Sequence, residues 1–118
     1  MVTFFKKVRT YMKMKECYGE DDMEIGYEKK LDVLGIMLES DYEYEVSIEI
    51  EAGFIIDLDK NNKLVAIEIV GCSEKINETP EYVEKADIKV FVDIYEFSYR
   101  IIISFNNGEK EIVRRVLK

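Results

Sequence analysis

The chain has 118 residues, 47% of them hydrophobic and 36% charged, and its formal net charge is −8; this composition excludes a disordered protein and fits one domain over residues 1–118. No apolar run approaches the ~20 residues of a transmembrane helix and the N-terminus has no uninterrupted apolar stretch, so we expect no membrane contact and a cytoplasmic location. The chain contains no histidine, which excludes Ser-His-Asp and Cys-His catalysis and imidazole metal ligands.

The first fifteen residues carry five basic side chains and no acidic one, so the net charge of −8 divides into +5 here and −13 in the remainder. Apolar residues recur at spacings of three and four, which predicts a short helix. We expect residues 1–18 to form a basic arm or helix that docks on the sheet, reaches an acidic partner subunit, or contacts nucleic acid or membrane. The acidic remainder opposes phosphate binding, and we therefore expect no nucleic-acid partner. The apolar residues with helical spacing in this segment are Phe4, Phe5, Val8, Tyr11 and Met12.

Residues 22–77 alternate apolar and polar side chains in the manner of half-buried strands, which predicts a β-rich module. Turns are expected at 28–30, at Ala52-Gly53 and at Lys60-Asn61-Asn62, where asparagine tolerates the left-handed backbone of tight hairpin loops. Residues 41–45 are expected to form an acidic loop. The expected strands are 23–28, 32–38, 46–51, 54–59 and 63–70.

Residues 78–118 are expected to add a helical turn and a β-hairpin extension. Thr79 before Pro80 is a good helix start and predicts a short helix through Lys85, followed by strands 88–95 and 98–105. The last segment has two interpretations. Asn107-Gly108 predicts a hairpin with a strand at 111–117, whereas the apolar spacing and an Asn106–Glu109 capping box predict a helix, and we favour the strand. The expected fold class is therefore α+β, with a mainly antiparallel sheet built from hairpins and one or two short helices.

Three short motifs resemble the family called domain of unknown function 2283, over roughly residues 25–75. They are Tyr27 followed by Leu31-Asp32-Val33-Leu34 and Ile36, then Gly53-Phe54-Ile55-Ile56-Asp57-Leu58-Asp59, then Leu64-Val65-Ala66-Ile67-Glu68-Ile69. The resemblance implies a compact β-rich module without an established activity. The chain departs from the family pattern at Gly35, where a tyrosine is usual, and at Asn62, where a turn glycine is usual.

The chain has two cysteines and an unusual composition. Cys17 and Cys72 are the only cysteines, so the sequence predicts free thiols and no disulfide framework. Histidine, glutamine and tryptophan are absent while lysine, glutamate, isoleucine and tyrosine are abundant, a bias that resembles proteins of heat-loving organisms.

One group of oxygen-bearing side chains has the spacing of a calcium-binding loop. Asp57, Asp59 and Asn61 are followed at the twelfth position by Glu68, and such oxygen ligands suit Ca²⁺ or Mg²⁺. The flanking segments have strand character rather than helical character, which favours a polar hairpin with Asp57 and Asp59 on one solvated face. We therefore expect no cofactor. The alternative to a polar hairpin is that these side chains bind a cation, in a cation-binding protein or a divalent-metal-dependent enzyme.

Another candidate feature is an aromatic cluster formed by Tyr95, Phe97 and Tyr99 at an expected turn. Aromatic residues near polar groups are favoured at protein interfaces. Strands 88–95 and 98–105 are also apolar on both faces and need a cover, most commonly an identical subunit. The leading hypothesis is thus a non-enzymatic, self-associating interaction or structural module that forms a homo-oligomer. The alternative is an acidic, antitoxin-like binder of a basic protein partner.

Overall fold

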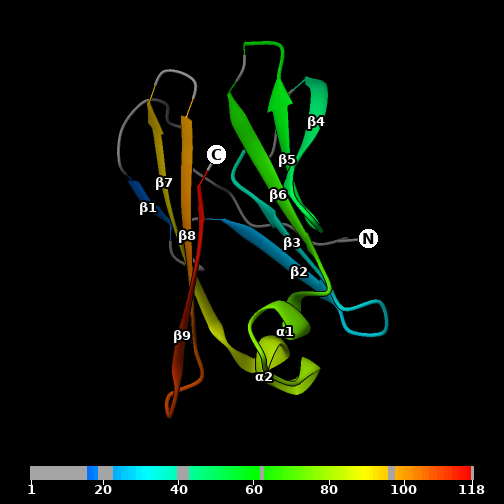
Figure 1. Ribbon diagram of the computed structural model, residues 1–118, viewed down its shortest axis with the longest axis vertical. Helices are drawn as coiled ribbons and strands as arrows, with labels where there is room; N and C mark the ends of the chain where they lie inside the picture. The colour runs from blue at the N-terminus through cyan, green and yellow to red at the C-terminus, as the bar shows by residue number, and fades with distance from the viewer. Residues whose placement is uncertain (1–15, 19–22, 40–42, 62, 96–97, 118) are drawn as a thin grey trace.

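Two antiparallel β-sheets pack face to face, and two short helices lie together at one end of the molecule (Figure 1). This computed structural model describes residues 16–18, 23–39, 43–61, 63–95 and 98–117. The strand order is β2-β3-β6-β5-β4 in the five-stranded sheet and β1-β7-β8-β9 in the four-stranded sheet. The predicted α+β class, with a mainly antiparallel sheet and short helices, is confirmed.

The five-stranded sheet contains a β2–β3 hairpin and a three-stranded β4–β5–β6 meander, which are joined by the pairing of β3 with β6, with Ile36 opposite Ile67. Its strands are β2 (Glu24–Glu28), β3 (Val33–Met37), β4 (Tyr44–Glu51), β5 (Phe54–Asp59) and β6 (Leu64–Val70). The expected strands are all present, but β4 begins two residues before the expected strand. Tyr44 pairs with Asp59 across an irregularity between Tyr44 and Val46, so the ladder extends into the segment that we expected to be an acidic loop.

The four-stranded sheet contains β1 (Glu16–Tyr18), β7 (Asp87–Tyr95), β8 (Ser98–Asn106) and β9 (Glu111–Leu117). The C-terminal strand is confirmed and the helical alternative is wrong. The backbone N–H of Asn107 donates to the carbonyl of Lys110 and closes the β8–β9 hairpin, while the Asn107 side chain accepts from the N–H groups of Glu109 and Lys110.

The prediction of a basic arm or helix over residues 1–18 is corrected for its last three residues. Residues 16–18 were expected to belong to a basic arm or helix, but they form strand β1, with Cys17 opposite Phe91 of β7. The pairing supplies hydrogen-bond partners to one edge of β7, which a continued helix would have left open. Residues 1–15, and with them the predicted helix, lie outside the described residues.

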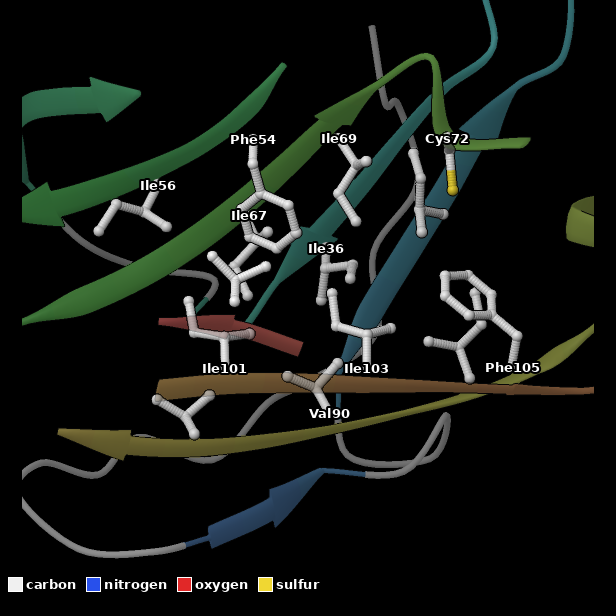
Figure 2. Packing of buried hydrophobic residues seen from close by; sticks show 14 of the residues in the cluster. Ile36, Phe54, Ile56, Ile67, Ile69, Cys72, Val90, Ile101, Ile103 and Phe105 are labelled. Atoms are coloured by element: carbon white, nitrogen blue, oxygen red, sulfur yellow. The ribbon is translucent and has the colours of Figure 1, made fainter. Parts of the chain in front are cut away.

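The inner faces of the two sheets share one hydrophobic core. Figure 2 shows Ile36, Phe54, Ile56, Ile67 and Ile69 from one sheet facing Val90, Ile101, Ile103 and Phe105 from the other. Each of these side chains is essentially buried, and full burial of such a residue stabilises the fold by roughly 1.5–3 kcal/mol. Phe91 and Ile102 pair on the outer face of the four-stranded sheet and are half-buried there, while the neighbouring pair on that face is Lys89 with Ser104.

Helices α1 (Cys72–Lys75) and α2 (Pro80–Lys85) connect the two sheets. The predicted start of α2 is confirmed, since Thr79 Oγ1 accepts a hydrogen bond from the backbone of Tyr82. The Tyr82 hydroxyl donates to the carbonyls of Phe105 and Lys110, at 3.0 and 2.8 Å, and so anchors the helix to the β8–β9 hairpin. Within the described ranges, neither helix is long and apolar enough to cross a membrane.

Candidate functional site

The oxygen-bearing side chains of the predicted cation loop are used by the β5–β6 hairpin itself. Asp59 is only 8% exposed, and its Oδ1 atom accepts the backbone N–H groups of Asn61 and Lys63 at 2.8 and 3.0 Å. The expectation that Asp59 lies on a solvated face is therefore wrong. A register shift between Asp57 and Leu58 breaks the alternation, so that Leu58 and Asp59 are both buried.

The other members of the predicted cation set have separate surroundings. Asp57 Oδ1 accepts a hydrogen bond from the hydroxyl of Ser47 on β4 at 2.5 Å. Glu68 is paired between Gly35 and Ile55, in the middle of the sheet. Among the residues that the structure describes, no group of three or more His, Cys, Asp or Glu side chains is arranged to hold a metal ion. The hairpin geometry thus assigns Asp59 a turn-forming role.

Replacing Asp59 with Ala should lower the free energy of unfolding by about 1–2 kcal/mol, because two hairpin N–H groups lose their acceptor. Asp59→Asn keeps an acceptor oxygen and should lose less than half of that amount. Chemical denaturation of both variants, with and without Ca²⁺ or Mg²⁺, provides the measurement. A metal-dependent stabilisation that disappears in Asp59→Asn would contradict the turn-forming role and support an ion site.

Two of the three aromatic residues predicted as an interface, Tyr95 and Tyr99, lie at the end of the β7–β8 hairpin. Tyr95 is paired with Ser98, and Tyr99 is paired with Ile94. Phe97 lies outside the described residues. Their role in an interface stays a prediction, and their position places it at one end of the four-stranded sheet.

A hydrogen-bond network around Asp32 links three elements that are far apart in sequence. The hydroxyl of Tyr27 on β2 donates to Asp32 Oδ1 at 2.6 Å. Ser73 in α1 donates its backbone N–H to Oδ1 at 3.0 Å and its hydroxyl to Oδ2 at 2.8 Å. The Asp32 carbonyl accepts the N–H groups of Gly71 and Cys72. Asp32 therefore fastens the β2–β3 turn to the start of α1.

The electrostatics of this network oppose nucleophilic chemistry. Burial and the hydrogen bond to Asp32 raise the pKa of Tyr27 well above its ordinary value. Burial and the nearby Asp32 charge raise the pKa of the Cys72 thiol from 9.0 to about 12, and this side chain is 0% exposed. Near neutral pH both groups are protonated, so neither is activated as a nucleophile. The network joins the β2–β3 turn to α1.

The sequence contained only part of the signal for this network. Tyr27 and Asp32 are five residues apart and lie in the first motif of the family resemblance. Ser73 is 41 residues from Asp32. Only the pairing of β3 with β6 brings Ser73 to the β2–β3 turn, and no residue spacing within the chain indicates that long-range pairing.

The sheet edges form a further candidate site. In the described part of the chain, β4 ends the five-stranded sheet and β9 ends the four-stranded sheet. Each edge strand has one exposed valine, Val46 at 39% and Val113 at 40% exposure. Arg114 of β9 donates to Glu51 of β4 at 2.5 Å, so the two edges lie on the same side of the molecule. An exposed edge presents unpaired backbone groups to another strand.

No curated protein and no solved structure matches the chain significantly. One family model matches it, over residues 24–73, which extend from the start of β2 to Ser73 of the Asp32 network. The expected resemblance over roughly residues 25–75 is therefore confirmed, and this segment of the chain matches the family described as protein of unknown function (DUF2283).

Proposed function

We propose that the protein is a non-enzymatic structural or interaction module that acts as a homo-oligomer joined through an exposed sheet edge. The observation that carries this proposal is the open edge of the four-stranded sheet. It presents the exposed side chain of Val113 beside a sheet face that contains Phe91 and Ile102. An added strand from a second subunit would pair with the backbone groups of this edge and continue the sheet.

The state of the chemically capable groups supports a non-enzymatic role. The Asp32 carboxylate accepts hydrogen bonds from Tyr27 and Ser73, and the Asp59 carboxylate accepts them from the hairpin backbone. The Cys72 thiol is buried in the core. Most chemical reactions that such groups catalyse require a carboxylate or thiol that can contact the substrate. In this chain these groups stabilise the fold instead.

Light scattering coupled to size exclusion should give a mass of at least two chains at micromolar concentration, with dissociation on dilution. The physical reason is that pairing of two edges satisfies backbone groups and buries apolar surface from both copies. The far-ultraviolet circular dichroism of the diluted sample serves as the control for folding. A mass of one chain at tens of micromolar would contradict self-association.

A further inference from the structure

We propose that two copies of the chain join by antiparallel pairing of their β9 strands, centred on Val113. Glu111 of each chain then faces Arg115 of the partner subunit. This inference rests on the proposed self-association and specifies its edge and its register. The resulting contact continues each four-stranded sheet into that of the other copy.

Comparison of the available edges favours β9. Strand β1 has three residues and β2 has five, which offers little backbone for an added strand. Strand β4 is longer, but its pairing with β5 contains two register shifts and its sequence includes Glu45, Glu49 and Glu51. Irregular and like-charged edges resist self-pairing. Strand β9 instead pairs with β8 in continuous register over all seven of its residues and carries both charge signs.

The hairpin geometry shows which peptide groups of β9 point toward its open side. Asn107 donates its N–H to Lys110, and this pair continues the β8–β9 register that places Asn106 opposite Glu111. Hydrogen-bonded and non-hydrogen-bonded pairs alternate along an antiparallel ladder. The peptide groups of residues 112, 114 and 116 therefore face β8, and those of 111, 113 and 115 face outward. The Arg115 carbonyl accepts a hydrogen bond from the Arg114 guanidinium at 2.9 Å, which agrees with its outward direction, and an N–H group of the added strand would replace this donor.

The side chains of these outward-facing positions select one register. Glu111, Val113 and Arg115 are all exposed and, by the period of two along a strand, share the outer face of the sheet. Pairing about Val113 places valine against valine and gives two opposite-charge pairs, a favourable cross-strand arrangement. A register shifted by one pair places Val113 against a charged residue. A register centred on Glu111 or on Arg115 places two like charges opposite each other.

Cysteine pairs test this register directly. In a Cys17→Ser background, Glu111→Cys and Arg115→Cys chains are unfolded together, refolded and oxidised. The mixture should form a disulfide-linked dimer, because directly opposed residues of a hydrogen-bonded pair have Cα atoms about 5.5 Å apart, within disulfide range. Either variant alone should stay unlinked, because its two copies lie about 13 Å apart along the strand direction. Val113→Cys alone should cross-link.

Lysine substitutions at the two matched valines test the edge without added cysteines. Val113→Lys places like charges at the centre of the contact and should raise the dissociation constant at least tenfold. Val46→Lys, at an equally exposed site on β4, should leave it unchanged. A dimeric mass combined with no cross-link in the mixture, or with dissociation by Val46→Lys alone, would overturn the β9 register while preserving self-association. A one-chain mass for the parent protein would overturn both.

Discussion

Replacing Asp32 with Ala is expected to lower the free energy of unfolding by about 3 kcal/mol. The variant leaves the Tyr27 hydroxyl and both Ser73 donors without their acceptor. Because these hydrogen bonds are only part-buried, water replaces some of the lost partners, and we expect about 1–2 kcal/mol from the three together. Asp32 also has φ 55°, a left-handed conformation that costs alanine roughly 1–2 kcal/mol. Urea denaturation followed by circular dichroism provides the measurement.

Two further variants separate the causes of this loss. Asp32→Asn retains an acceptor oxygen and a side chain that tolerates the left-handed backbone, so it should lose roughly 1 kcal/mol. Asp57→Ala removes a carboxylate that accepts an exposed hydrogen bond from Ser47, and its loss should stay below about 1 kcal/mol. Equal losses for Asp32→Ala and Asp57→Ala would show that the Asp32 network contributes no special stability.

The same network makes stability depend on pH in the acid range. Burial of Asp32 acts to raise its pKa, but the hydrogen bonds from Tyr27 and Ser73 outweigh it and hold the pKa below its ordinary value. A lowered folded-state pKa contributes stability above the unfolded-state value, near 3.9, and this stability is lost as the pH falls through the folded-state value. Asp32→Asn should therefore show a shallower decrease in stability below about pH 4.

The sequence predicts the strands well because the apolar side chains alternate wherever one sheet face is buried. It also places the α2 start, since Thr79 and Pro80 act within a single turn of helix. The order of the strands in the sheets is harder to predict from the sequence, because the pairing of β3 with β6 depends on contacts between distant segments. Strand β1 escapes a periodicity analysis because three residues are too few to show a period.

The candidate sites, too, could be predicted from the sequence only where the interacting residues are close together in the chain. The spacing of Asp57, Asp59 and Asn61 identifies oxygen atoms that suit a cation. It does not show that the Asp59 carboxylate already accepts hydrogen bonds from two backbone N–H groups of the hairpin. Similarly, Asn107 and Gly108 predict the β8–β9 turn from the sequence. The hydrogen bond from the Tyr82 hydroxyl of α2 to this hairpin is not predictable in this way, because it joins residues that are far apart in the chain. Local chemistry is therefore visible in the sequence, and partners brought together by the fold are not.

Gly53→Ala is expected to lower the free energy of unfolding by about 3 kcal/mol, although the change adds only one methyl group. Gly53 has φ +76°, where alanine is disfavoured by roughly 1–2 kcal/mol. A Cβ atom would also lie 2.9 Å from the carbonyl oxygen of Val70, whose N–H donates to the Gly53 carbonyl at 2.7 Å. This backbone contact cannot move aside without disturbing the link between β5 and β6, so the strain adds to the conformational cost.

Gly108→Ala supplies the matched control, because Gly108 also has positive φ, at +95°, but nothing lies within 4 Å of an added Cβ atom. Only the conformational cost remains there, and the expected loss is roughly 1–2 kcal/mol. Parallel urea denaturation of the two variants measures the difference, which reports the contacts of the added Cβ atom with the Val70 carbonyl and with the side chain of Lys75 that donates to it. If Gly53→Ala loses no more stability than Gly108→Ala, the close approach of Gly53 to the end of β6 contributes nothing beyond the backbone conformation, and the turn between β4 and β5 is more adaptable than its hydrogen bonds indicate.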